Sequence, residues 1–367
     1  NQMLEQQGEP PAFPSIDNVS IPLLRRREQD TRLSLTAPLY APEISAGIDA
    51  RRALLESAHA RYEATARVLV REVKRAYYGA AQADAAVEIL GASEALLSED
   101  VRVAESLVRE GSATQDRALR ARAEQLAVAQ RLDATRASAN AARRQFNALL
   151  DRDADAEIEL PSVDNAQVPA SAIDTPAIRP ELRQLERAAE AADASTRAAQ
   201  ARRLPELALG ADYGIEGERY RFRREDDFAI VSLVLRWNLF DFGGRRAAVA
   251  GAAAEANQLR AERRNLERQL DLALRTARDD LATAQRAIAT AEARLEAADA
   301  SFRIAERKRA EASLSHVEFL DAERALTEAR LNLAIARFTF LDQLAELELA
   351  TATYPLPADT LAGGMRE

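Results

Sequence analysis

The feature that most limits the fold of this chain is a long stretch without helix-breaking residues. Glycine does not occur over residues 252–362, and proline does not occur over residues 206–354. About 100 residues can therefore continue as helix, which corresponds to roughly 150 Å at 1.5 Å per residue. No compact domain has this length, so the stretch must be a hairpin of two long helices or a rod.

Apolar residues at heptad spacing favour the hairpin. Large apolar residues recur every seven positions from Leu274 to Phe302, and an alanine follows each of them three positions later. A second series with the same period runs from Phe319 to Leu347. Large and small residues in such a pattern form the packing seam of a coiled coil. We therefore expect two antiparallel limbs with a turn near residues 311–315.

The pattern of strand and hairpin occurs twice along the chain. The Leu-Ser-Leu sequence at residues 33–35 corresponds to Leu-Val-Leu at residues 233–235, and a similar helical pattern follows each copy. An internal repeat of this kind indicates the duplication of one structural unit. The predicted fold is therefore mainly α with a β part, built as a tandem duplication of strands plus a long coiled-coil hairpin.

The duplication sets the predicted boundaries of the first part of the chain. The first structural repeat covers residues 1–150, with strands over about 18–40 and a helical hairpin over about 44–150. Its N-terminal part is incomplete by comparison with the second repeat. A linker is expected over residues 151–178, where prolines begin to gather, and a C-terminal tail over residues 351–367.

The second structural repeat is predicted over residues 179–350. It begins with a helix over about 180–203, which has no counterpart in the first repeat. Two strands follow over about 206–216 and 228–240, and a helical hairpin over about 244–350 completes the repeat.

The predicted strands alternate between apolar and polar residues, which gives each of them one apolar face. Residues 33–39 and 231–239 show this alternation most clearly. Strands of about nine to eleven residues match a tilted bilayer crossing. Three or four strands cannot close a barrel by themselves, because small barrels need at least about eight. The strands therefore form either a soluble sheet with one wet face or part of a barrel that several chains build together.

The composition excludes several classes of function. The chain has no cysteine, and its only histidines are His59 and His316, so we expect no metal site and no cofactor. Phosphate-binding glycine loops and nucleophile-elbow motifs are missing, so we expect no enzyme. The net charge of −9 disfavours nucleic acid as a partner. Apolar runs are too short to predict a transmembrane helix.

Four segments resemble the outer-membrane efflux protein family, the TolC-like channel proteins, and the resemblance covers nearly the whole chain. In chain order they are Arg-Pro-Glu-Leu at 179–182, Ala-Arg-Arg-Leu-Pro-Glu-Leu at 201–207, Trp-Asn-Leu-Phe-Asp-Phe-Gly-Gly-Arg at 237–245 and the last limb from Phe-Leu-Asp-Ala at 319–322 to Phe-Leu at 340–341. In the third segment Gly243 and Gly244 resemble the family's turn from strand to helix, where glycine permits the reversal of the chain.

The resemblance implies a homotrimer whose chains each give four strands to a twelve-stranded β-barrel in the Gram-negative outer membrane. The hairpins continue this barrel as a periplasmic α-helical barrel. Such proteins passively conduct substrate from an inner-membrane pump, joined to it by a periplasmic adaptor (membrane-fusion) protein, in tripartite efflux or type I secretion systems. The alternative is a soluble periplasmic coiled-coil adaptor or scaffold protein, which should carry one hairpin flanked by compact β-domains.

The resemblance also implies a gate at the periplasmic tip. The gate acids of the family fall on Glu318 and Asp321, which lie three residues apart on one helical face. In a trimer they form a carboxylate ring that selects cations and raises its own pKa values by repulsion. Asp116, Arg117 and Arg309 are candidate gate partners, which would hold the closed state through ion pairs. The pattern alone favours a solvated helix face beside a turn.

Small residues at the predicted hairpin turns are candidate contacts for the adaptor. They are Gly111 and Ser112 in the first hairpin and Ala312 and Ser313 in the second, and a plain helical turn explains them equally well. His316 lies beside the proposed gate. A single histidine without a second ligand is more typical of a surface residue than of a pH switch or a metal site.

Overall fold

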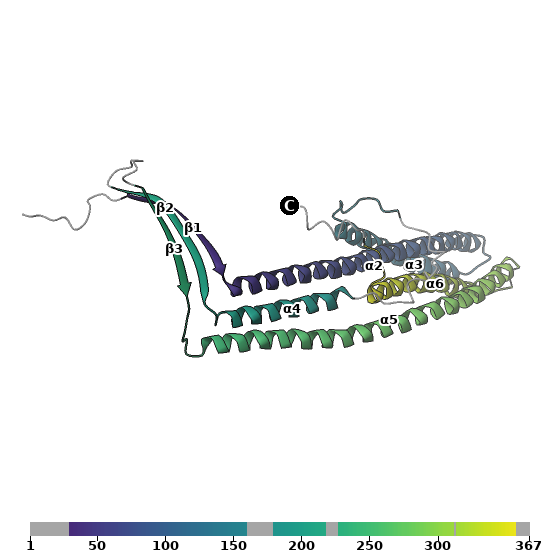
Figure 1. Ribbon diagram of the computed structural model, residues 1–367. Helices are drawn as coiled ribbons and strands as arrows, with labels where there is room; N and C mark the ends of the chain where they lie inside the picture. Colours follow the sequence, from purple (N-terminus) through teal and green to yellow (C-terminus); the bar gives the residue numbers. More distant parts are fainter. Residues whose placement is uncertain (1–28, 160–178, 218–226, 312, 357–367) are drawn as a thin grey trace, which may run out of the picture. The chain divides into compact units, whose positions relative to one another are not determined.

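The computed structural model describes residues 29–159, 179–217, 227–311 and 313–356. Its elements in chain order are β1 (Gln29–Tyr40), α2 (Pro42–Arg109), α3 (Gln115–Leu149), α4 (Pro180–Ala201), β2 (Glu206–Gly217), β3 (Asp227–Arg236), α5 (Gly244–Ala310) and α6 (His316–Thr351) (Figure 1). The predicted strand region before residue 29 lies outside the described residues. No helix within these four ranges is both long enough and apolar enough to cross a membrane.

The chain divides into two compact units. One contains residues 1–50 and 193–253, and the other contains residues 51–192 and 254–367. We call the first the sheet unit, because it holds all three described strands, and the second the helical unit. Each unit contains residues from both halves of the sequence, so the units do not coincide with the two predicted repeats.

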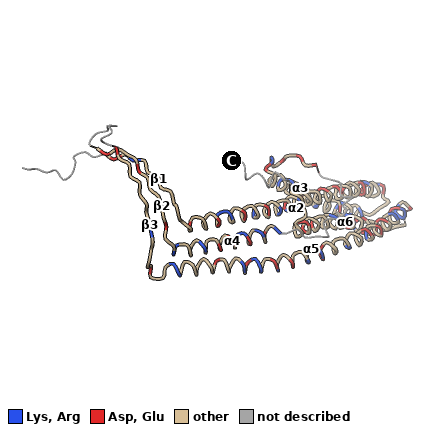
Figure 2. Tube along the Cα trace, in the orientation of Figure 1, with Lys and Arg blue, Asp and Glu red and all other residues tan. Residues whose placement is uncertain are grey.

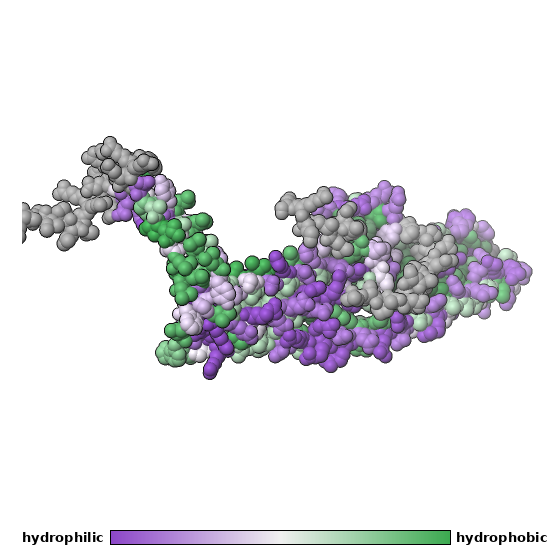
Figure 3. Space-filling model, in the orientation of Figure 1, coloured by the Kyte–Doolittle hydropathy of each residue, from purple (hydrophilic) through white to green (hydrophobic). Residues whose placement is uncertain are grey.

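The sheet unit contains one antiparallel sheet with the strand order β1-β2-β3. Leu35 of β1 pairs with Ala211 of β2, which pairs in turn with Val231 of β3. Because alternate residues of a strand point to opposite faces, Ile230 and Val234 of β3 point to one face of the sheet. The other face is shared by Leu33 and Leu35 of β1, Leu209 of β2, and Val231 and Leu233 of β3. That face is open: Leu35 is 67% exposed and Val231 is 76% exposed. Figure 3 shows apolar residues gathered along the strands.

The end of β3 differs from the sequence prediction. The strand predicted over residues 228–240 ends at Arg236. After this residue the backbone leaves the sheet, and the indole Nε1 of Trp237 donates a hydrogen bond to the carbonyl oxygen of Arg203 at 3.1 Å. Alternation of apolar residues continues beyond Arg236, which explains why periodicity alone places the end of the strand too late.

The core of the helical unit follows the predicted heptads. Ala277, Leu281 and Ala284 of α5 are buried against Phe340 and Leu347 of α6. The alanines permit close approach of the two helices, and the larger side chains fill the space beside them. Figure 2 shows basic and acidic residues interspersed along the helices, as expected for coiled-coil limbs with solvated faces.

The first hairpin packs against the second through α2. Leu97 of α2, which is fully buried, lies in one apolar cluster with Phe302 of α5 and Phe319 of α6. Leu90 lies in another cluster with Leu331 of α6. The apolar core of the helical unit therefore consists of separate clusters, each of which joins residues far apart in the sequence.

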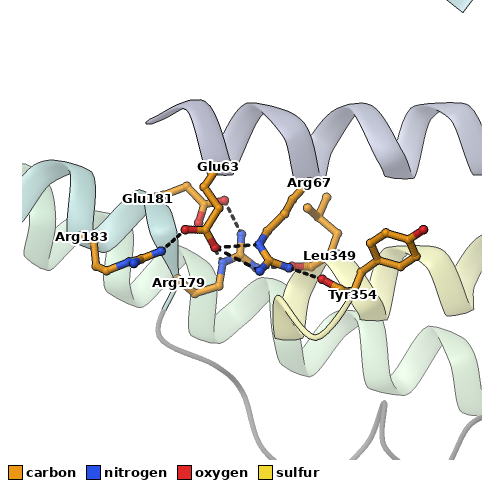
Figure 4. A network of polar contacts seen from close by, with 7 residues as sticks. All are labelled: Glu63, Arg67, Arg179, Glu181, Arg183, Leu349 and Tyr354. Atoms are coloured by element: carbon orange, nitrogen blue, oxygen red, sulfur yellow. Dashed lines mark hydrogen bonds and ion pairs between the residues drawn. The ribbon is translucent and has the colours of Figure 1, made fainter. Parts of the chain in front are cut away.

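The C-terminal end of α6 is held by an arginine that precedes α4. Arg179 Nη1 donates hydrogen bonds to the carbonyl oxygens of Leu349 and Ala350 at 2.7 and 2.8 Å (Figure 4). Its other nitrogens bind the carboxylate of Glu181 at 2.7 and 3.0 Å. The helix ends at Ala352, which has a left-handed backbone with φ +54°. Arg179 thus satisfies carbonyl groups that the end of a helix leaves without partners.

A carboxylate on α2 connects the same region to the rest of the helical unit. Glu63 accepts hydrogen bonds from Arg67 at 3.0 and 3.2 Å and also pairs with Arg183 of α4. Arg67 Nη1 in turn donates to the carbonyl oxygen of Tyr354 at 2.8 Å. These side chains, with Arg179, fix the start of α4 and the end of α6 against α2 (Figure 4).

Candidate functional site at the hairpin tips

The turn between α2 and α3 is built around a glycine. Gly111 has φ +76°, a conformation that other residues rarely adopt. The N–H of Gly111 donates to the carbonyl oxygen of Val108 at 3.0 Å, and that of Ser112 donates to Leu107 at 2.8 Å. This is the Schellman pattern of helix termination. A Cβ atom at Gly111 would meet nothing within 4 Å, so the backbone angle alone requires glycine there.

The turn between α5 and α6 ends in a capping box. Ser313 donates its N–H to the carbonyl oxygen of Lys308 at 2.9 Å, and Ala312 lies outside the described residues. Ser315 is the N-cap of α6, and its hydroxyl oxygen accepts from the N–H of Glu318 at 3.3 Å. The carboxylate of Glu318 accepts in return from the N–H of Ser315 at 3.0 Å and from its hydroxyl at 2.7 Å. The turn is therefore fixed by its own side chains.

This arrangement gives Glu318 a structural role in addition to the predicted gate role. The hydroxyl and the N–H of Ser315 hold the pKa of the Glu318 carboxyl below its usual value. A ring of like charges would act in the opposite direction. The Ser-x-x-Glu sequence at 315–318 is the recognised pattern of a capping box. Sequence reasoning missed this role although the signal was present.

Asp321 belongs to a second, exposed set of charges. Its carboxylate binds Arg324 Nη1 at 3.1 Å, and Arg324 Nη2 binds the Glu124 carboxylate of α3 at 3.0 Å. This bridge connects the start of the last helix to the returning limb of the first hairpin. Side chains of opposite charge on separate helices cannot be paired from spacing alone, and neither Arg324 nor Glu124 was predicted.

Beneath these exposed acids lies a buried ionic layer that joins three helices. Asp100 of α2 is only 2% exposed and forms an ion pair with Arg309 at the end of α5. The Arg309 guanidinium also lies over the ring of Phe319, 3.9 Å from its centroid. Nε2 of His316, the first residue of α6, is 3.6 Å from the second carboxylate oxygen of Asp100. We call these residues the Asp100 layer.

Burial corrects one prediction for this region, and two of the candidate gate partners form ion pairs within their own chain. The side chain of His316 is 8% exposed, so the expectation of a surface histidine is wrong. Arg309, a candidate gate partner, pairs with Asp100 of its own chain. Asp116 pairs within α3 with Arg120 at 3.1 Å. Nε of Arg117 is buried and has no hydrogen-bond partner in the described part of the chain.

The surroundings of His316 favour its neutral form. Burial lowers the pKa of His316; the charge of Asp100 opposes this shift, whereas Arg117, Arg309 and Arg120 add to it. Both ring nitrogens are buried without a hydrogen-bond partner among the described residues. Within those residues, no group of three or more potential ligands is placed to hold a metal ion.

A second polar layer lies one heptad away from the first. Glu323 of α6 is 4% exposed and accepts hydrogen bonds from the hydroxyls of Ser93 of α2 and Thr327 of α6. Ser93 precedes Asp100 by seven residues, as His316 precedes Glu323. Polar residues at seam positions of the heptad were therefore the available signal, and sequence reasoning did not use it.

The predicted strand-to-helix turn lies in the sheet unit. Gly243 has φ +90°, whereas Gly244 is the first residue of α5 and does not have a positive φ. The Asp241 carboxylate accepts hydrogen bonds from the N–H of Gly243 at 3.3 Å and of Arg245 at 2.7 Å. Only the first of the two glycines is therefore required by the backbone.

Three solved structures share this architecture. The CmeC outer membrane channel of Campylobacter jejuni matches with a TM-score of 0.78 and 13% identity, over 88% of this chain and 71% of that chain. The outer membrane protein VceC of Vibrio cholerae matches with a TM-score of 0.75 and 19% identity, over 88% of this chain and 79% of that chain. The open state of the MtrE outer membrane channel of Neisseria gonorrhoeae matches with a TM-score of 0.73 and 18% identity, over 90% of this chain and 80% of that chain. The fold is therefore that of the outer-membrane channel proteins.

A sequence comparison with protein families identifies one family among the outer-membrane channel proteins. Residues 175–353 match the sequence model of the family described as outer membrane efflux protein, so the chain carries a domain of that family. The resemblance found in the sequence is thereby confirmed. The predicted location in the outer membrane is confirmed as well, because the family description names it. A comparison with curated protein sequences found no match.

Proposed function

We propose that this protein is the outer-membrane exit duct of a tripartite efflux or type I secretion system. It passively conducts substrate that an inner-membrane pump delivers through a periplasmic adaptor, and it is a conduit rather than an enzyme. The family domain and the channel fold support this role. Three chains combine their strands into one barrel in the outer membrane, and the hairpins continue it as a periplasmic α-helical barrel.

The observation that carries the proposal is the incomplete sheet. Within the described residues, β1 and β3 are edge strands, so each has one side without a neighbouring strand. The apolar face is also uncovered, since Leu33 is 76% exposed and Leu233 is 64% exposed. Burial of each such side chain contributes about 1.5–3 kcal/mol. Pairing of strand edges between chains would satisfy the open backbone groups of β1 and β3, and contact with lipid would remove the apolar face from water.

The mass of the particle extracted from outer membranes in mild detergent tests this proposal. After subtraction of bound detergent, we expect a mass of about three chains, because one sheet cannot close a barrel alone. A single chain recovered from the soluble fraction would contradict the proposal. The three strands would then form an ordinary half-buried sheet, and a soluble coiled-coil adaptor or scaffold would be the better explanation.

The gate is proposed at the tips of the hairpins. Glu318 and Asp321 are both exposed at the start of α6, and three copies would line a narrow pore with carboxylates. Gly111, Ser112 and Ser313, with Ala312, remain the proposed contacts for the adaptor. Arg117 is the remaining candidate for holding a neighbouring chain, because Asp116 and Arg309 have partners within their own chain.

Ion selectivity in planar bilayers tests the gate. Asp321→Asn should lower the preference of the channel for cations, because it removes one carboxylate from each chain in the ring. Glu296→Gln removes an exposed acid from α5, away from the tip, and should leave the preference unchanged. Equal selectivity of the Asp321 variant and the unmodified channel would remove Asp321 from the gate.

A further inference from the structure

A pocket of about 450 Å³ opens at the passage from β3 to α5, within the sheet unit. Its lining combines basic side chains with large apolar ones. The basic and large apolar side chains are those of Arg203, Trp237, Leu239, Phe240, Arg245 and Arg246. None of them belongs to the gate or to the adaptor contacts proposed above.

The three arginines of the pocket differ in their partners. Arg245 is fully engaged, because its guanidinium binds the Asp241 carboxylate at 2.8 Å and the carbonyl oxygen of Asn238 at 2.5 Å. Arg203 and Arg246 are exposed, and their guanidinium groups have no hydrogen-bond or ion-pair partner within the part of the chain that the structure describes. The pocket therefore holds two positive charges that are available to a ligand.

The apolar side of the pocket is equally uncovered. Leu239 is 73% exposed, Phe240 is 71% exposed, and Phe242, the next aromatic residue, is 93% exposed. The rings of Phe240 and Phe242 meet edge to face with their centroids 4.6 Å apart. Trp237 is 56% exposed, and its polar end is already satisfied by the hydrogen bond to the Arg203 carbonyl. Leu239 and Phe240 therefore place exposed apolar surface in the same pocket as the two free arginines.

A ligand for this surface must carry an anionic group directly beside an apolar body. Guanidinium groups bind phosphate oxygens through paired hydrogen bonds. Tryptophan favours the boundary between lipid chains and headgroups, and leucine and phenylalanine favour the lipid chains themselves. We propose that the pocket binds the phosphate of an anionic phospholipid. Arg203 and Arg246 donate to the phosphate oxygens, and Leu239, Phe240 and Phe242 contact the glycerol and the acyl chains.

This inference rests on the proposed function, because a barrel formed by the strands places the passage to α5 at the surface of the membrane. It adds a specific lipid site to the general contact between barrel and lipid. Two free arginines near a lipid surface should together strengthen the binding of an anionic headgroup about thirtyfold.

The single tryptophan of the chain makes the site directly measurable, since Trp237 lines the pocket. Brominated phosphatidylglycerol and brominated phosphatidylcholine, titrated into the purified trimer in mild detergent, quench its fluorescence only on close approach. We expect at least about a tenfold preference for phosphatidylglycerol. The double variant Arg203→Ala with Arg246→Ala should bind both lipids equally.

Two controls decide between the possible occupants. The double variant Arg264→Ala with Arg268→Ala removes two exposed arginines of α5 outside the pocket and should keep the preference. Inorganic phosphate at millimolar concentration should not displace the brominated lipid. Displacement by free phosphate would overturn the proposal in favour of a simple anion site.

Three further results would overturn the inference in distinguishable ways. An unchanged lipid preference in the Arg203 and Arg246 double variant, with the trimer intact, would exclude the lipid site and leave the channel proposal untouched. Loss of the trimer in that variant would show that the pocket is a contact between chains. A wild-type protein that is not a trimer would remove the proposed function, and this inference with it.

Discussion

The capping box shows how one hydroxyl determines where the last helix begins. Ser315 and Glu318 exchange three hydrogen bonds at the first turn of α6. An N-cap of this type fixes the backbone before the helix and satisfies amide groups that the helix itself leaves open. The position of Asp321 and of the Asp100 layer therefore depends on Ser315, which is itself exposed.

Ser315→Ala should loosen the first turn of α6. Loss of an N-cap hydroxyl costs about 1 kcal/mol, so the amides of residues 317–319 should exchange hydrogen about fivefold faster, as measured by mass spectrometry of peptides from the purified trimer. Ser301→Ala, at an exposed position inside α5 and away from its first turn, is the matched control and should leave exchange unchanged. Equal exchange in both variants would mean that the capping box does not limit opening of the turn.

His316 should make the same region sensitive to acid. Its pKa in the folded chain lies below the ordinary value of 6.5, because burial and the arginines around it disfavour the charged ring. A group of this kind stabilises the fold when it is neutral, and this contribution is lost as the pH falls from about 6.5 through the lowered pKa. Hydrogen exchange at the start of α6, corrected for intrinsic rates, should therefore accelerate between about pH 7 and pH 5.

The other histidine provides the control for this experiment. His316→Asn should remove most of the pH dependence at the start of α6, whereas His59→Asn, on α2 outside the tip, should retain it. If hydrogen exchange still accelerates at low pH in the His316 variant, the carboxylates of the tip and not His316 are responsible for the pH dependence. Burial of His316 could not be predicted from its neighbours in sequence, because it results from the docking of α5 and α6 onto Asp100 of α2.

Among the elements, the helices were the most predictable part of this protein. Residues seven apart on one helix reveal its buried seam without knowledge of any other element, as Ala277 and Ala284 show. The junctions between elements were less predictable. Arg179 reaches carbonyl oxygens of Leu349 and Ala350, and no local pattern in the sequence connects these residues.

Arg179→Ala should destabilise the helical unit through the end of α6. The substitution removes both hydrogen bonds of Arg179 Nη1, although the Leu349 carbonyl oxygen keeps the N–H of Ala352 as a donor at 3.1 Å. We expect a cost of about 2 kcal/mol, since hydrogen bonds from a charged donor contribute about 1.5–3 kcal/mol. Thermal unfolding followed by circular dichroism measures this loss. Arg187→Ala breaks exposed ion pairs with Glu56 and Glu190 and should cost less than about 1 kcal/mol. If both variants lose a similar amount of stability, the hydrogen bonds of Arg179 to the end of α6 do not stabilise this junction more than an exposed ion pair does.

At the scale of the whole molecule, the alternation of the strands predicted an apolar face, and the register confirms that the three strands share it. The trimer is implied by the resemblance to a channel family, and it is therefore part of the proposed function. The pocket lined by Arg203 and Arg246 could not be predicted from the sequence, because one of these arginines precedes β2 and the other follows β3 along the chain.

Charges placed on the two faces of β3 should have opposite consequences for assembly. Leu233→Arg places a charge on the apolar face, which should cost about 2–4 kcal/mol near the middle of a bilayer and reduce the yield of membrane-extracted trimer. Ser232→Arg changes the adjacent residue, which points to the opposite face, and should assemble normally. Comparable trimer yields from the two variants, measured by native electrophoresis of outer-membrane extracts, would contradict a lipid-facing apolar surface.

The two polar layers between α2 and α6 also restrict how these helices can slide. Along α2, Ser93 and Asp100 alternate with the buried Leu90 and Leu97 at heptad spacing. A shift of one helical turn would move Asp100 away from Arg309 and into the leucine-rich part of the seam, where its charge would have no partner. The hairpins can therefore part or pivot about this seam, but they resist axial slippage, and any movement between them must keep the same helical turns opposite each other.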